Sequence, residues 1–318
     1  MSTLTNLKTH LTSQFTPLPL PTTPFTNKTI IITGANTGLG LETARHLVRL
    51  DAAKVILAVR SPAKGDAAAA SIAASTNRPP GVAEAWALDL ASHASIEAFA
   101  RRVERELPGR VDVLVANAGV YMTAFEVAPE AGGEEMTVAV NVVGHMLLVL
   151  LLLPKMRETV TTAAFPERRA ADVFAELADP ARARMGDRYY VSKLIQLLTA
   201  REFANELTRS TKPGNITSTV VNPGFVATQI MRHGGLLSQI YVKLLQKVMS
   251  RTPEEGSRTL VHGAAGGEET HGQYLDDCKV GSPSAFVLSP EGEKTQKQLW
   301  RELTEKLEKI HPGIMQNI

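Results

Sequence analysis

The stretch Thr33–Gly40 (TGANTGLG) decides the fold of this chain. It stands between a short apolar run, Lys28–Thr33 (KTIIIT), and an amphipathic stretch, Leu41–Leu50, so its glycines have the spacing G-x3-G-x-G at a strand-to-helix turn. Glycine lets the backbone approach a pyrophosphate closely, and the free N–H groups of the following helix then face its negative charge. The alternative is a glycine-rich turn that only packs the helix on the strand. The position after a first strand favours dinucleotide binding, by Gly34, Asn36, Gly38, Leu39 and Gly40.

Further apolar runs alternate with helical patterns along the chain. The predicted strands after the first are Lys54–Val59, Val82–Asp89, Val111–Ala116, Ile216–Val221 and a short last one at Ala285–Leu288. Because these runs lack polar alternation, we expect a parallel sheet that is buried on both faces. The repeating strand–helix order predicts an α/β class, a doubly wound (Rossmann) sheet with helices on both faces. We expect one domain over residues 27–318, after an extended lead-in at 1–26. The predicted helices are 41–50, 63–75, 95–107, 235–250, 253–265 and one that opens at Ser289.

Composition excludes several classes of protein. The 318 residues carry a net charge of +2, which gives no electrostatic argument for binding nucleic acid or an anionic membrane surface. A single cysteine, Cys278, cannot form an intrachain disulfide, and the eight histidines show no metal-binding spacing, so we expect no metal site. The longest strongly apolar run, Met146–Leu153, is too short to span a bilayer, and residues 1–26 lack the pattern of a signal peptide. We therefore expect a cytoplasmic protein.

The end of the second predicted strand bears on the choice of cofactor. An acidic residue there would bind the ribose 2′-hydroxyl of NAD(H), whereas this chain has Arg60, with Lys64 close behind. Two cations at this point favour the 2′-phosphate of NADP(H). The alternative is a solvated basic loop.

A second candidate site lies at Tyr189-Tyr190-Val191-Ser192-Lys193, at the start of a helical stretch. Tyr189 and Lys193 lie at positions i and i+4, so they fall on one face of the helix. A phenol with a pKa near 10 is a poor acid–base group at neutral pH, but a neighbouring ammonium lowers that pKa and lets the pair move a proton to or from a carbonyl oxygen. Taken alone, a Tyr-x3-Lys pair also occurs by chance on many helix surfaces.

The order of these motifs is more specific than any one of them. The chain carries TGANTGLG at 33–40, then Leu88-Asp89-Leu90, Asn117-Ala118-Gly119, Asn141, Tyr189-x3-Lys193 and Asn222-Pro223-Gly224. In this order it resembles the short-chain dehydrogenase/reductase family over about 28–235, and more loosely beyond. Leu39–Glu42 and Val59–Ser61 look like the retinol-dehydrogenase-like branch, which includes reductases of fungal secondary metabolism.

The resemblance implies a role for each matching position. Tyr189 would be the general acid/base, Lys193 would lower the pKa of Tyr189 and hold the nicotinamide ribose, and Asn141 would fix a water molecule beside Lys193. The other implied cofactor contacts are Asp89 and Leu90 at the adenine, Asn117, Ala118 and Gly119 on the cofactor floor, and Pro223, Gly224, Val226 and Thr228 at the nicotinamide end. Strand termination is the alternative explanation for the two turns 117–119 and 222–224.

One expected element is missing. The family's catalytic serine follows a fifth strand between the Asn141 and Tyr189 helices, but here residues 147–158 look like the end of a helix and 167–185 like another helix. Three explanations are open. Thr159–Thr162 forms an abbreviated strand in which Thr161 or Thr162 supplies the hydroxyl, the chain lacks that function, or the sequence misses a coding segment. Ser192 is a poor substitute, because it points about 100° away from Lys193 on the helix. The loss of one oxyanion donor costs roughly 10²–10³ in rate.

Two hypotheses about function follow. The first is an NADP(H)-dependent oxidoreductase acting on a carbonyl/alcohol pair of a small, apolar substrate, with a helical lid at about 235–265. A helix packed on the core or on a second subunit is the alternative for the apolar stretch 235–250. The second hypothesis is a cofactor-binding, catalytically impaired relative with a regulatory or structural role. The resemblance also implies pairing as a homodimer or homotetramer, because the helices of Asn141 and Tyr189 carry apolar faces at Leu147–Leu153 and at Leu194, Leu197 and Leu198.

Overall fold

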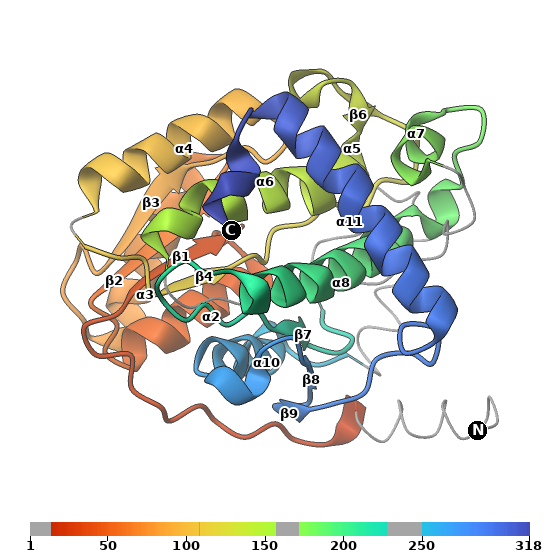
Figure 1. The fold of residues 1–318 in the computed structure, drawn as a ribbon. Coiled ribbons are helices and arrows are strands. Elements are labelled where there is room, and N and C mark those ends of the chain that lie inside the picture. Colours follow the sequence, from red (N-terminus) through yellow and green to blue (C-terminus); the bar gives the residue numbers. More distant parts are fainter. Residues whose placement is uncertain (1–13, 108, 157–171, 228–249) are drawn as a thin grey trace.

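The computed structural model describes residues 14–107, 109–156, 172–227 and 250–318 (Figure 1). Its centre is a parallel sheet of β1 (Thr29–Thr33), β2 (Lys54–Val59), β3 (Ala83–Ala87) and β4 (Val113–Val115). The strand order is β3-β2-β1-β4, and Ile31 of β1 lies opposite Ile56 of β2 and Leu114 of β4. This arrangement confirms the parallel α/β sheet predicted from the sequence.

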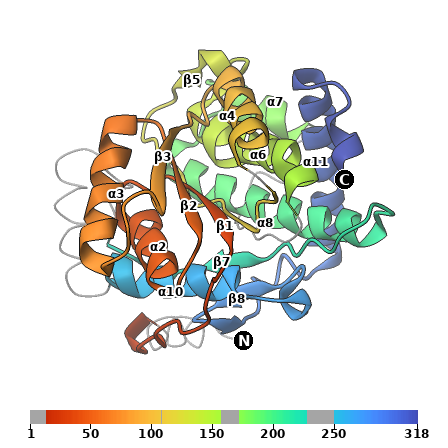
Figure 2. The same cartoon turned by 90° about the vertical axis from the view of Figure 1, so that its left-hand side faces the viewer.

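Helices cover both faces of the sheet. Successive side chains of a strand point to opposite faces, so the apolar strands need a covering layer on each side. Ile30 and Ile32 pack in a core with residues of α2, α3 and α10, whereas Ile31 packs in a second core with residues of α4, α6 and α8. Figure 2 shows these two groups of helices on the two sides of the strands. Their bounds are α2 (Gly38–Arg49), α3 (Pro62–Thr76), α4 (His93–Glu106), α6 (His145–Leu152), α8 (Met185–Arg209) and α10 (Pro253–Ala264).

The helix that carries Asn141 is a continuous run of four segments. It starts with α5 (Met136–Val138), passes through a π-helical turn η2 (Ala139–Gly144) and α6, and ends with η3 (Leu153–Lys155). The run Met136–Lys155 is long and apolar enough to cross a membrane, but 89% of its most apolar window is buried inside the protein. It is a core helix, and a Cβ at Gly144 would lie 2.3 Å from the carbonyl oxygen of Leu90. The helix therefore needs glycine there to pack against the loop that follows β3.

A second, smaller sheet contains the later strands. β7 (Val220–Asn222) pairs in parallel with β8 (Tyr274–Asp276), which pairs antiparallel with β9 (Lys279–Val280). Within the described ranges no strand joins β4 to β7, where the predicted fifth strand would lie. The N–H of Val111 donates to the carbonyl of Lys155 at 2.9 Å, in an isolated parallel bridge between Val111 and Met156. The chain therefore runs beside the start of β4 at Met156, and the predicted strand Thr159–Thr162 lies outside the described residues.

The helix α11 (Pro290–Ile310) packs across α8, as Figure 1 shows. The Trp300 ring lies 6.1 Å from that of Phe203, measured between centroids. Leu147, Leu150 and Leu198 are fully buried, and Leu194 is 7% exposed. The apolar faces from which we predicted self-association are thus covered within one chain. Pairing as a homodimer or homotetramer remains a prediction, and it would need other surfaces.

Two elements predicted from the sequence differ from those in the structure. The expected last strand at Ala285–Leu288 is a turn, and the late strands are β8 and β9 instead. The expected helix over 167–185 is described only from residue 172, where it consists of α7 (Val173–Ala178), a turn and the start of α8. The other short elements are β5 (Val127–Ala128), η1 (Pro129–Ala131), β6 (Glu134–Glu135), η4 (Glu268–Thr270) and η5 (Ile314–Asn317).

Candidate active site

The glycine turn has the geometry of an anion-binding loop. Gly34 and Gly38 have φ values of +67° and +57°, which side chains other than glycine rarely adopt. A Cβ at Gly40 would lie 2.6 Å from Nδ2 of Asn117 and 2.7 Å from the carbonyl oxygen of Gly34. The cap residue Thr37 makes no side-chain bond to the first N–H groups of α2, and the first turn has no acidic residue. The residues therefore fit a pyrophosphate at this helix N-terminus.

The Asn117–Gly119 turn lies directly against the glycine turn. Nδ2 of Asn117 donates to the carbonyl of Thr33 at 2.8 Å. A Cβ at Gly34 would lie 3.0 Å from Cα of Ala118, so the two turns pack backbone to backbone. This contact brings together the predicted phosphate loop and the predicted cofactor floor.

The predicted adenosine end has exposed cations. Arg60 is the first residue after β2, and Lys64 lies in the first turn of α3; both are exposed. Asp89 accepts the N–H of Ala91 at 2.9 Å through Oδ1, and Leu90 is buried. Asp89 thus shapes its own loop, and the two cations are placed at the strand end where selection between the dinucleotides is expected.

Tyr189 and Lys193 lie together near the start of α8, as predicted. Nζ of Lys193 is 5.8 Å from the centroid of the Tyr189 ring and donates to Oε1 of Gln196 at 2.8 Å. Burial raises the pKa of Tyr189 to about 12 and lowers the pKa of Lys193 to about 8. The expected lowering of the tyrosine pKa is therefore wrong for this structure, because burial raises the pKa of Tyr189 and the neighbouring Tyr190 adds to the rise.

Asn141 joins this pair from the π-helical turn. Its Nδ2 donates to the carbonyl of Val120 and to Oγ of Ser192, both at 3.0 Å, and its Oδ1 accepts the N–H of Val120 at 2.9 Å. A Cβ at Gly119 would lie 3.4 Å from Oδ1 of Asn141 and 3.8 Å from Nζ of Lys193. The structure thus gathers the end of the cofactor floor, Asn141 and Lys193 at one point, and π-helical turns are frequent at functional sites.

Ser192 does not take the place of the missing serine. It is fully buried, donates to the carbonyl of Tyr189 at 2.7 Å and accepts the bond from Asn141. Its hydroxyl therefore fixes Asn141 to α8. The other candidates for this hydroxyl, Thr161 and Thr162, lie outside the described residues.

The turn at Pro223-Gly224 is supported by a buried ion pair that the sequence did not reveal. Gly224 has a φ of +76°, and its N–H donates to Oδ1 of Asn222 at 3.1 Å. Arg251, which is 2% exposed, pairs with Asp277 at 2.7 Å and donates to the carbonyl of Pro223 at 3.4 Å. Val226 pairs with Arg251 in an isolated bridge, and the predicted contact Thr228 lies outside the described residues.

Two more tyrosines surround Tyr189, and sequence reasoning missed one of them. The Tyr121 ring lies 5.3 Å from that of Tyr189, and the Tyr190 ring lies 5.7 Å from it on the same helix. Tyr121 comes two residues after the Asn117–Gly119 turn, so its position beside a cofactor floor was the available signal. Tyr190 is 59% exposed, so an aromatic surface adjoins the phenol.

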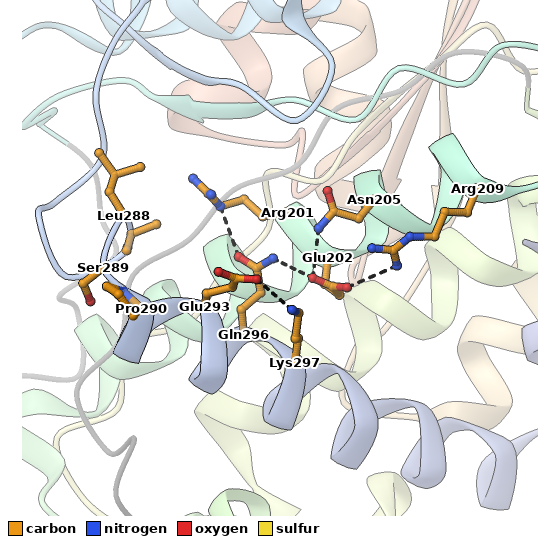
Figure 3. Close-up of a pocket in the computed structure, with 11 residues that line it drawn as sticks. Arg201, Glu202, Asn205, Arg209, Leu288, Ser289, Pro290, Glu293, Gln296 and Lys297 are labelled. Atoms are coloured by element: carbon orange, nitrogen blue, oxygen red, sulfur yellow. Dashed lines mark hydrogen bonds and ion pairs between the residues drawn. The ribbon is translucent and has the colours of Figure 1, made fainter.

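A polar cavity of about 320 Å³ lies elsewhere, between α8 and α11 (Figure 3). Nε of Arg201 donates to Gln296 at 3.1 Å, whose Nε2 donates to Glu202 at 2.6 Å. Because Arg201 is two helical turns beyond Lys193 and these side chains bind one another, the cavity is separate from the predicted site. Among the residues that the structure describes, no group of three or more histidine, cysteine, aspartate or glutamate side chains could hold a metal.

Comparisons with known proteins agree with this geometry. A family model described as short chain dehydrogenase matches residues 28–163. The chain is 41% identical over 324 residues to a short chain dehydrogenase/reductase, dmxR8, of Cryptosporiopsis sp., covering 95% of this chain and 97% of the relative. It is 43% identical over 291 residues to the short chain dehydrogenase atnD of Emericella nidulans, covering 85% and 90%. The first alignment is longer than the 318 residues of this chain, so the relative has residues where this chain has none.

Solved structures show the same architecture. An uncharacterized protein of Mycobacterium paratuberculosis matches with a TM-score of 0.68 and 25% identity, over 92% of this chain and 98% of the other. The 3-ketoacyl-(acyl-carrier-protein) reductase of Brucella melitensis, solved with NADH, matches with a TM-score of 0.56 and 20% identity, over 79% and 97%. The second likeness concerns the fold alone.

Proposed function

Because the chain belongs to the short-chain dehydrogenase/reductase family, we propose that it is an NADP(H)-dependent oxidoreductase that transfers a hydride between the nicotinamide and a carbonyl/alcohol pair. The observation that carries this proposal is the convergence of Tyr189, Lys193 and Asn141 at the end of the Asn117–Gly119 turn. The glycine turn on the opposite side of that floor fits the pyrophosphate of such a cofactor.

Tyr189 is the proposed proton donor. The bound nicotinamide would supply the hydride for reduction, or accept it in the reverse direction. A pKa of about 12 keeps the Tyr189 phenol protonated at neutral pH, so the phenol is ready to protonate a carbonyl oxygen as that oxygen gains negative charge. We propose reduction of the carbonyl as the direction, with the protonated phenol as the proton donor.

Lys193 would act as the electrostatic partner of Tyr189. With a pKa of about 8 it is mostly charged at pH 7, and it can stabilise the phenolate that forms when the proton leaves. Its bond to Gln196 is within the same helix, so a rotation of the lysine side chain would free it to hold a ribose hydroxyl. The Asn141 side chain is engaged with Val120 and Ser192, and the water expected beside Lys193 stays a prediction.

Arg60 supports the choice of NADP(H). An exposed arginine at the end of β2 can pair with a 2′-phosphate, and a charge-assisted bond of this type contributes about 1.5–3 kcal/mol. We therefore expect Arg60→Asp to weaken NADPH binding by about 10-fold or more while leaving NADH binding largely unchanged. Titration of both dinucleotides tests this, with Arg101→Asp on α4 as the control. Equal losses for NADPH and NADH, or none, would refute the preference for the phosphate.

We propose a small, apolar molecule as the substrate, because of the apolar stretch 235–250, most of which lies outside the described residues, and because exposed Tyr190 adjoins Tyr189. We also propose a place in fungal secondary metabolism, in line with the relatives from Cryptosporiopsis and Emericella. A cytoplasmic location stays a prediction of the sequence.

A second candidate function is that of a cofactor-binding relative without efficient catalysis. The observation in its favour is that no described strand joins β4 to β7, where the serine-bearing strand would lie. The two functions differ in whether NADPH is consumed. A panel of apolar ketones that leaves bound NADPH unoxidised would support the impaired relative, whereas turnover with any of them would support the enzyme.

A further inference from the structure

The hydroxyl of Thr33 joins the glycine turn to the cofactor floor. Thr33 is fully buried at the end of β1, and its Oγ1 accepts the N–H groups of Asn117 at 3.0 Å and of Ala118 at 2.9 Å. These two bonds use both lone pairs of the hydroxyl, so its own proton requires an acceptor. Nε2 of His145 lies 3.2 Å away, nearer than the carbonyl of Val115 at 3.5 Å.

His145 is suited to this role only in one protonation state. It is 2% exposed, and it follows the π-helical turn that contains Asn141. Since Nε2 accepts from Thr33, the ring proton is on Nδ1, which has no hydrogen-bond partner among the described residues. An imidazolium would point a further N–H at an oxygen that has no free lone pair. Only the neutral ring therefore completes the network.

The surroundings keep the ring neutral. Burial, and then the nearby charge of Lys193, lowers the pKa of His145 to about 3. The acceptor at Nε2 is consequently present throughout the pH range in which the protein would work. The network is thus a permanent connection between the ends of β1 and β4 and the helix of Asn141.

We propose that His145 is a positioning residue, which acts through Thr33 to hold the Asn117–Gly119 turn in the place where the cofactor binds. It touches no cofactor atom in this scheme. The same ring ties this floor to the helical turn of Asn141, because His145 directly follows that turn. The inference rests on the proposed function only in that a nicotinamide dinucleotide binds at this floor.

The test compares variants that keep or remove the acceptor. His145→Gln retains an oxygen that can accept from Thr33, whereas His145→Phe fills the site without one. We expect NADPH to bind about 10-fold more weakly to His145→Phe and within about threefold of the unmodified chain to His145→Gln, since one buried hydrogen bond is at stake. Thr33→Val also removes the acceptor of the Asn117 and Ala118 N–H groups, so it should weaken NADPH binding at least as much as His145→Phe. Adding His145→Phe to Thr33→Val should cost little more. His46→Phe is the control, because His46 is equally buried and bonds Glu254 at 2.8 Å.

Several results would overturn the proposal. A folded His145→Phe chain that binds NADPH as the unmodified chain does would contradict it, and so would equal losses in the Gln and Phe variants. If His145→Phe does not fold, unchanged NADPH binding by Thr33→Val refutes it. If the unmodified chain binds neither NADPH nor NADH, the proposed function fails, and amide exchange decides the positioning role separately. The N–H groups of Asn117 and Ala118 should then exchange faster in His145→Phe than in His145→Gln.

Discussion

Acid should destabilise this protein through His145, and the size of the effect follows from its burial. The pKa of His145 is lowered from an ordinary value of 6.5 to about 3, so the unfolded chain binds a proton that the folded chain excludes. Stability from this residue is therefore complete above about pH 6.5 and falls as the pH drops toward 3. The cost approaches about 1.4 kcal/mol for each pH unit below the unfolded pKa, where half of the unfolded chains already carry the proton, and amounts to about 2.3 kcal/mol between pH 6.5 and 4.5.

Urea unfolding of the unmodified chain and of His145→Gln, at pH 6.5, 5.5 and 4.5, measures this directly. His46, His93 and His262 also have pKa values lowered by burial, so the unmodified chain loses stability for several reasons at once. The difference between the two chains isolates His145, because the other histidines and Lys193 are present in both. We expect the difference to shift by about 2.3 kcal/mol in favour of the glutamine variant over this interval. Parallel stability curves would refute the neutral, buried imidazole and the network built on it.

Three further predictions concern other parts of the site. Replacing Arg188 by Met should cost about 3–5 kcal/mol in chemical unfolding, because Arg188 is 1% exposed and its guanidinium lies 3.9 Å from the fully buried Glu135. The carboxylate would keep its bonds from Thr137 and Val138 but lose the facing cation, and a loss below about 1 kcal/mol would contradict this. Gly144→Ala should lower the free energy of unfolding by about 1–3 kcal/mol, because the added methyl group pushes the Asn141 helix away from Leu90. An unchanged melting temperature would show that the site accommodates the methyl group. Carbonyl reduction should decline as the pH rises through about 8, where Lys193 loses its proton, and a rate that stays constant to pH 9.5 would exclude a charged lysine in catalysis.

The order of the early elements could be predicted from the sequence because each depends on local patterns. Continuous apolar runs such as Lys54–Val59 fix the buried strands, and the glycines of 33–40 identify the turn after β1. The helix start at Ser289-Pro290 could also be predicted from the local sequence, and the Ser289 hydroxyl accepts the N–H of Gly292 at 3.1 Å. The predicted strand at Ala285–Leu288 failed, because four apolar residues without a partner strand do not make a sheet.

The contacts that hold the site together could not be predicted, since they join residues far apart in the chain. Nothing near Arg251 in the sequence indicates its pairing with Asp277 under the Pro223 turn. The bond of His145 to Thr33 spans more than a hundred residues. The pKa of Tyr189 was predicted in the wrong direction, because the spacing to Lys193 was visible whereas the burial of the phenol was not.

The central claim is that Tyr189 gives the proton in an NADPH-dependent reduction. The measurement that tests it most directly is NADPH oxidation with apolar ketones by the unmodified chain, Tyr189→Phe and the neighbouring control Tyr190→Phe, with NADPH binding measured for each. The account predicts turnover by the unmodified chain and the Tyr190 variant, and a loss of about 10²-fold or more in Tyr189→Phe while it still binds NADPH. Equal turnover in Tyr189→Phe and the unmodified chain would contradict the account.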